Sequence, residues 1–145
     1  MSYEEARMAF TGQYERRQKL SLLRRELVGI KSQCSMFIIP DTTQRTFAPV
    51  ASELPLGIIE MIISDSFLIL EEHGRLLADL NQARLLARQI NHATLQFFQE
   101  LTRFGPGIDP KGQREQHNAK MQWFIQSLQD TLDRCIEGLA QVMHD

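Results

Sequence analysis

The sequence of 145 residues predicts an all-α fold, an antiparallel helical bundle with coiled-coil character. Apolar residues recur at alternating steps of three and four over most of the chain, which is the spacing of one face of a helix. All five prolines fall in two short regions, residues 40–55 and 106–110, so long stretches are free of helix breakers. No segment shows the apolar-polar alternation of a strand. Three long helices are therefore expected, or four if the middle helix breaks at Gly74.

The first helix is expected over residues 1–37, because this stretch lacks proline and is rich in helix formers. Its second half carries one apolar stripe: Leu20, Leu23, Leu27, Ile30, Cys34 and Phe37. In the first half the stripe thins to a line of Tyr3, Ala6, Phe10 and Tyr14, and Gly12 weakens the helix. The second half is therefore expected to dock on a core, and the first turns to fray or to pack on another copy.

Residues 38–51 are expected to form an irregular loop, because Pro40, a polar run and Pro49 interrupt the helical pattern. The apolar loop residues, including Phe47, are expected to lie along the apolar sides of the following helix. On this interpretation the loop is first a structural cover, and it becomes a partner site only if the cover is shed.

Residues 52–103 are expected to form either one long helix or a helical hairpin. Ser52 is suited to cap such a helix, and Pro55 is tolerated in a first turn. The three-four spacing runs from Ile59 to Phe104 and passes Gly74 without a change of phase. Because a reversal has no reason to preserve that phase, the pattern favours one continuous helix; a break at Gly74 remains the alternative.

Glycine and proline in residues 104–109 predict a second loop, followed by a last helix over residues 110–144. Its apolar stripe again steps by three and four: Met121, Ile125, Leu128, Leu132, Cys135, Leu139 and Val142. A chain of this length suits one core, so residues 1–145 are expected to be a single helical-bundle domain.

The segment around residues 54–70 is apolar on two sides. If Ile59 and Ile62 face inward, the helical period places Leu54, Met61 and Leu68 on nearly the opposite side. A helix with two apolar sides needs two partners, unless it is simply central in the bundle. These three residues, with Phe47, are the candidate surface for a second copy or another protein. The expected function is a non-enzymatic protein–protein interaction or scaffold module, self-associating as a homodimer.

Charges are segregated along the chain although the formal net charge is only -2. Arg17, Arg24 and Lys31 lie seven residues apart and share a helix face, whereas residues 53–72 hold five acids and no base. This basic face suggests an alternative function, nucleic-acid or anionic-surface binding. The acidic total and the lack of a docking motif favour instead a solvated face or one that meets the acidic segment.

No motif for catalysis, a cofactor, a metal or a small-molecule substrate stands out, so no enzyme and no cofactor are expected. His73, His92, His117 and His144 are widely spaced, and a helical sensor or metal-binding bundle is a second alternative. Cys34 and Cys135 both fall on apolar stripes, which predicts two reduced, buried thiols too far apart to pair.

The N-terminus lacks the features of a secretory signal, and the most apolar stretch, residues 54–70, contains Glu60 and Asp65. This stretch is also shorter than the roughly 20 residues that a spanning helix needs. The expected location is cytoplasmic, or membrane-associated through an anchor in a longer parent protein.

Several short motifs follow one another between Leu20 and Leu101: LLRREL at residues 22–27, a proline-bounded loop, LP at residues 54–55 and LN at residues 80–81. The combination resembles helical soluble regions of uncharacterised bacterial membrane-anchored proteins, although the aromatic residue expected a turn before LN is absent. The resemblance implies no activity. It implies a helical interaction or sensor-like module whose membrane anchor lies outside this chain.

Overall fold

The computed structural model describes residues 2–38, 53–64, 73–102 and 112–144. These ranges contain helices and no strand, which confirms the all-α prediction. The elements are α1 (Tyr3–Gln33), the 3-10 helix η1 (Cys34–Phe37), α2 (Gly57–Ser64), α3 (Gly74–Thr102) and α4 (Gln113–His144).

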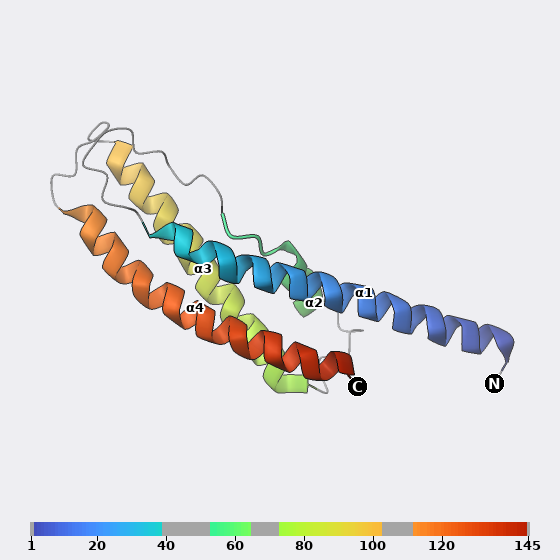
Figure 1. The fold of residues 1–145 in the computed structure, drawn as a ribbon. Helices are drawn as coiled ribbons and strands as arrows, with labels where there is room; N and C mark the ends of the chain where they lie inside the picture. Colours follow the sequence, from blue (N-terminus) through green and yellow to red (C-terminus); the bar gives the residue numbers. More distant parts are fainter. Residues whose placement is uncertain (1, 39–52, 65–72, 103–111, 145) are drawn as a thin grey trace.

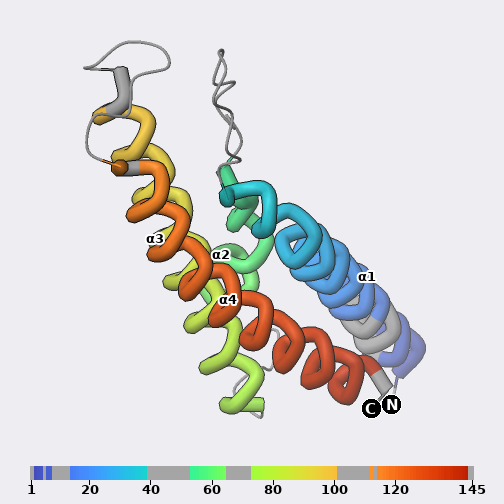
Figure 2. Tube along the Cα trace, turned by 60° about the vertical axis from the view of Figure 1, so that its left-hand side comes forward, coloured from blue at the N-terminus to red at the C-terminus, as the bar shows by residue number. Residues whose placement is uncertain are grey.

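The three long helices and the short α2 form a closed antiparallel arrangement (Figure 1). α4 packs against both α1 and α3, and α2 packs against the same two helices. α4 runs opposite to α1 and α3 (Figure 1); for α3 the contacts of Asp79 with Arg134 and of Phe97 with His117 give the same order. Figure 2 shows α2 between α1 and α3. The structure is therefore an antiparallel bundle of four helices within the described residues.

The apolar stripes predicted from the sequence are the faces that form the core. All six stripe residues of α1 and η1 between Leu20 and Phe37 are buried, and so are all seven of α4 between Met121 and Val142. In α2 and α3 the buried stripe positions are Ile59, Ile62, Leu76, Leu80, Ala83, Ala87, Ile90, Thr94 and Phe97. Removing these side chains from water is the main stabilising contribution to the bundle.

The interpretation of residues 52–103 as one continuous helix is wrong. Leu54 is hydrogen-bonded to Asn91, and Glu60 is ion-paired with Arg88, so α2 lies antiparallel beside α3. In a continuous helix the 28 residues between Glu60 and Arg88 would separate them by about 42 Å. The alternative, a fourth helix, is correct. Gly74 is the first residue of α3 rather than the end of the preceding helix.

Two predicted boundaries also shift. α2 begins at Gly57 rather than Ser52, and residues 53–56 are not helical. The last helix begins at Gln113 rather than residue 110, after Gly112 in the left-handed region at a φ of 62°. Glycine adopts this conformation without the steric cost of a side chain. The expected cover formed by the loop after Ile38 lies outside the described residues, and its premise, a long second helix, is removed.

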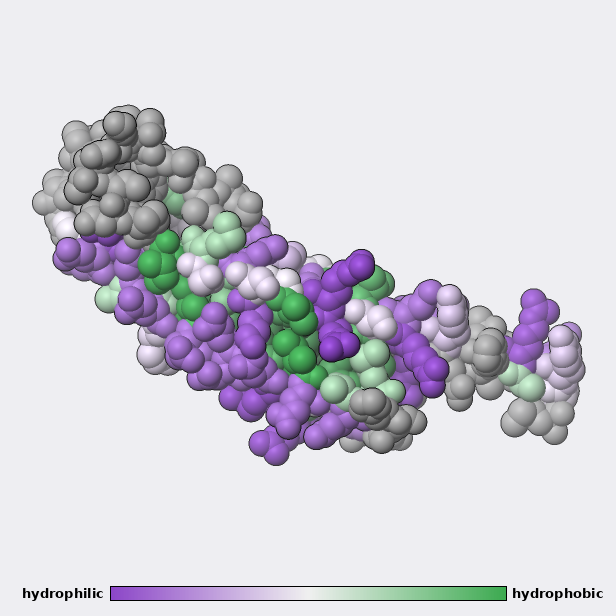
Figure 3. Space-filling model, in the orientation of Figure 1, coloured by the Kyte–Doolittle hydropathy of each residue, from purple (hydrophilic) through white to green (hydrophobic). Residues whose placement is uncertain are grey.

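On the face seen in Figure 3, hydrophobic residues gather over the middle of the bundle and hydrophilic residues dominate elsewhere. Within the four described ranges, no helix is both long enough and apolar enough for a membrane crossing.

The contact between Asn91 and Leu54 is a direct test of the antiparallel α2–α3 pair. Replacing Asn91 by alanine leaves the main-chain N–H and C=O of a buried residue without this side-chain partner. We expect Asn91→Ala to lower the free energy of unfolding by about 1–3 kcal/mol, measured by urea denaturation. His92→Ala, an exposed neighbour, is the control and should change it by less than about 0.5 kcal/mol. Equal urea midpoints for the two variants would contradict the α2–α3 pairing.

Candidate functional site

The N-terminus of α2 is capped by a carboxylate from another helix. Glu26 of α1 accepts hydrogen bonds from the backbone N–H of Ile59 (2.9 Å) and of Ile58 (3.4 Å). The first N–H groups of a helix have no partner within it, and the positive end of the helix dipole favours an anion there. Glu26 therefore fixes the start of α2 on the side of α1.

The Glu26 carboxyl is half-buried, and its removal from water raises its pKa above the usual range. The two backbone N–H groups act in the opposite direction, because they stabilise the ionised form, and the nearby Glu60 carboxylate adds to the rise. Burial is the largest of these effects. The side chain thus serves α2 as an acceptor in a partly dry site.

Asn91 of α3 holds the other side of the same segment. Its Oδ1 accepts from the Leu54 N–H at 2.8 Å, and its Nδ2 donates to the Leu54 carbonyl at 3.2 Å. One side-chain amide therefore satisfies both main-chain groups of a buried residue, as a neighbouring strand would. A turn later, Glu60 of α2 pairs with Arg88 of α3; the Arg88 Nε lies 3.1 Å from the Glu60 Oε1.

The predicted partner surface is not assembled as expected. Leu54 is only 2% exposed and belongs to the core, because it precedes α2 in a non-helical segment where the helical period does not apply. Met61 is 41% exposed, so this residue alone of the described pair is accessible. Phe47 and Leu68 lie outside the described residues. Among the described residues of the predicted surface, only the Met61 side chain is thus exposed.

Only part of the predicted basic face of α1 is exposed without an ion pair to another helix among the described contacts. Arg17 and Arg24 are exposed on α1, but Lys31 is ion-paired with Asp133 of α4. The complement proposed for this face was the acidic segment after residue 53. Of those acids, Glu60 meets Arg88 on α3 instead. α1 and α2 are in contact, but the ion pairs of Lys31 and Glu60 run to α4 and α3, so the basic face of α1 is not paired with the acids of α2 in the described residues.

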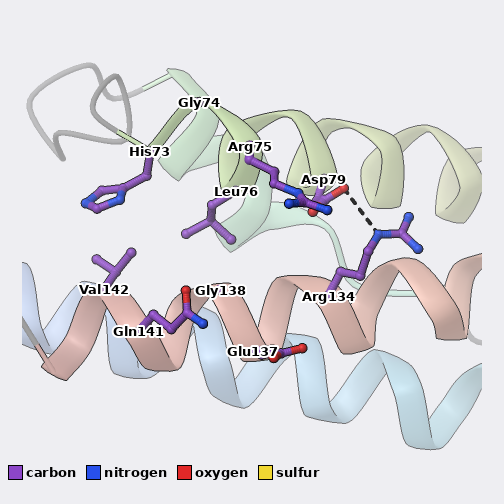
Figure 4. A pocket seen from close by; sticks show the side chains of 10 residues that line it. All are labelled: His73, Gly74, Arg75, Leu76, Asp79, Arg134, Glu137, Gly138, Gln141 and Val142. Atoms are coloured by element: carbon purple, nitrogen blue, oxygen red, sulfur yellow. Dashed lines mark hydrogen bonds and ion pairs between the residues drawn. The ribbon is translucent and has the colours of Figure 1, made fainter.

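A pocket of about 500 Å³ lies between the first turns of α3 and the last turns of α4 (Figure 4). Arg134 spans its wall to Asp79, with Nε 3.5 Å from Oδ1. Gly138 of α4 faces Leu76 of α3, since a Cβ built on this glycine would lie 3.4 Å from Leu76 Cδ1. The lining residues are His73, Gly74, Arg75, Leu76, Asp79, Arg134, Glu137, Gly138, Gln141 and Val142. The lining includes two arginines, Arg75 and Arg134, and two acids, Asp79 and Glu137, so the pocket does not present charge of one sign to a ligand.

His117 is the buried histidine that the sequence did not single out. It is 7% exposed, and its ring stacks on Phe97 with the centroids 4.5 Å apart. The imidazole bonds to the main chain at Phe37, while its Nε2 has no hydrogen-bond partner in the part of the chain that the structure describes. Burial, and to a lesser extent the charge of Lys120, lower its pKa. This neutral imidazole therefore joins η1, α3 and α4.

The two thiols are free and buried, as predicted. The Cys34 Sγ donates to the Lys31 carbonyl at 3.3 Å, and burial raises its pKa. Burial beside Asp79 raises the pKa of Cys135 to about 12. A reactive cysteine needs an exposed, electropositive setting that lowers the pKa, and both environments do the reverse. Among the described side chains, no group of three or more metal-ligating residues comes together.

The buried imidazole makes the stability depend on pH. In the unfolded chain His117 has its ordinary pKa of 6.5, whereas in the folded protein its pKa is lower. The free energy of unfolding should thus be unaffected by this group above pH 6.5 and should fall as the pH decreases through its folded pKa. His117→Gln should remove this part of the pH dependence, measured by urea denaturation from pH 7.5 to 5. The exposed His92→Gln is the control; a profile like that of His117→Gln would refute the assignment.

The thiols provide a second check of the packing. In native buffer we expect neither Cys34 nor Cys135 to react rapidly with a thiol reagent, because each is buried and its pKa is raised. In denaturant without reductant both should react. A count below two in denaturant would show a disulfide, and rapid native labelling would show that the buried face opens.

Comparison of the chain with known protein families, with curated proteins and with solved structures found no match.

Proposed function

We propose that the chain is a non-enzymatic helical interaction module that associates with a second copy of itself. The observation that carries the proposal is the projection of α1. Its N-terminal half extends past the ends of the other helices, away from the bundle (Figure 1). Among the α1 side chains that the structure describes, none before Leu20 is buried.

A projecting helix of this length needs support from elsewhere. Isolated helices shorter than about 12–15 residues are marginal in water, and most helical stability comes from packing an apolar face. The projecting half nevertheless exposes Tyr3 by 82% and Tyr14 by 56%. Tyrosine is enriched in protein interfaces, because its ring is apolar and its hydroxyl remains satisfied by water or protein. These features support a protein partner rather than permanent solvent exposure.

The remaining exposed apolar residues support no competing site. Seven other large apolar side chains are each at least 41% exposed, and they are spread over every described helix: Leu22, Val28, Met36, Met61, Leu85, Leu95 and Trp123. Single exposed apolar side chains are normal on a monomer surface. The basic face is a weaker basis for function than the sequence suggested, since Lys31 is neutralised by Asp133.

Self-association is tested by sedimentation equilibrium of the full chain over a range of concentrations. We expect a reversible monomer–dimer equilibrium, because the projecting helix offers a short seam and small interfaces bind weakly. Far-ultraviolet circular dichroism along the dilution series should show loss of helix as the monomer forms. A chain that stays monomeric at all concentrations with unchanged helix content would contradict the proposal.

A further inference from the structure

The charges on the projecting half of α1 are distributed unevenly along its axis. Residues 3–7 carry two acids and one base, whereas residues 15–19 carry one acid and three bases. The outer end is therefore acidic and the end beside the bundle is basic. Two such helices packed in parallel would bring their basic ends together. In an antiparallel pair, the acidic end of each helix lies beside the basic end of the other.

We infer that two copies of the chain pair antiparallel along residues 3–19 of α1. The inference rests on the proposed function and adds its surface and geometry. With the twofold axis near residue 11, Glu4 lies level with the Gln18 position of the second copy and Arg7 with the Glu15 position. No residues of like charge come level in this register. Because the interface is isologous, every favourable charge contact occurs twice.

The aromatic residues fit the same seam. Tyr3 and Tyr14 are eleven residues apart, which is close to three whole turns, so they share one face of the helix. The Tyr14 hydroxyl accepts a hydrogen bond from Gln18 Nε2 at 2.8 Å, which keeps the polar tip satisfied within its own helix. The ring face is left for contact with a partner. Two exposed aromatic side chains per copy thus contribute apolar area to the seam.

The position of the seam on the molecule also suits a second copy. The first buried side chain of α1 among those described is Leu20, directly after the overlap. Because α1 projects past the ends of the other helices (Figure 1), the antiparallel pair would place the two bundles at opposite ends of a seam about 25 Å long. Residues 3–19 hold four bases and three acids. A second copy of this near-neutral segment, in the opposite direction, complements its charges. A strongly anionic surface would be attracted to the segment only weakly, because the net charge is close to zero.

The test uses charge reversal in the full chain. Variant A, Arg16→Glu with Arg17→Glu, makes both ends of the segment acidic; variant B, Glu4→Arg, makes both ends basic. Each alone should have a dimer dissociation constant raised about tenfold or more by like-charge repulsion. An equimolar mixture of A and B should recover association, because acidic ends then meet basic ends. Circular dichroism at matched high concentration, with a thermal melt, verifies that each bundle is folded.

A matched control carries the same change of charge outside the overlap. Arg24→Glu with Arg25→Glu alters two exposed residues of α1 that lie alongside the bundle, and it should associate as the wild-type chain does. Weakening equal to that of variant A, or a mixture of A and B no tighter than either alone, would overturn the inference. A wild-type chain that is monomeric would refute the proposed function itself. Wild-type association unchanged by A and B would refute only this surface.

Orientation is measured separately by cross-linking. Under mild oxidation, a chain with Glu4→Cys should form a disulfide with a chain carrying Gln18→Cys in preference to a copy of itself. The native thiols are buried and should not compete. Preferential pairing of Glu4→Cys with itself would indicate a parallel seam and overturn the antiparallel geometry.

Discussion

The placement of α2 depends on satisfying the main-chain groups at its start. Leu54, Ile58 and Ile59 bring backbone N–H groups into the region between α1 and α3, where two of these three residues are buried. A buried N–H without an acceptor costs free energy comparable to a lost hydrogen bond. Glu26 and Asn91 supply the acceptors from opposite sides. The short helix, which alone would be unstable, is in this way fixed between two long ones.

The surface ion pairs add orientation more than stability. Lys31 with Asp133, Glu60 with Arg88, and Asp79 with Arg134 each join two different helices, but all six side chains are at least partly exposed. Exposed pairs of this kind contribute little free energy, since water already stabilises the separate charges. Their value is directional, because each pair is compatible with the antiparallel register and with few others. The apolar core supplies the stability, and the charges select the arrangement.

The two buried cysteines and the buried histidine have environments that do not favour the catalytic chemistry for which these residue types are often used. Cys34, Cys135 and His117 are all residues that catalysis employs, yet burial moves the pKa of each away from a reactive value. His117 of α4 instead packs on Phe97 of α3 and hydrogen-bonds to the main chain at Phe37 of η1. This one side chain therefore connects η1, α3 and α4. These environments support a structural role for the three side chains.

The sequence by itself determined which face of each helix is buried, because a 3.6-residue period is a local property that every core helix must show. It therefore located the stripes around Leu27, Ile90 and Leu132 correctly. It could not determine which helices face each other, and only the tertiary structure decided that α2 folds back on α3. The apolar phase passes Gly74 unchanged because both helices bury a face in the same core. Likewise, nothing local distinguishes Glu26 and Asn91 from surface residues, since their partners lie about 33 and 37 residues away.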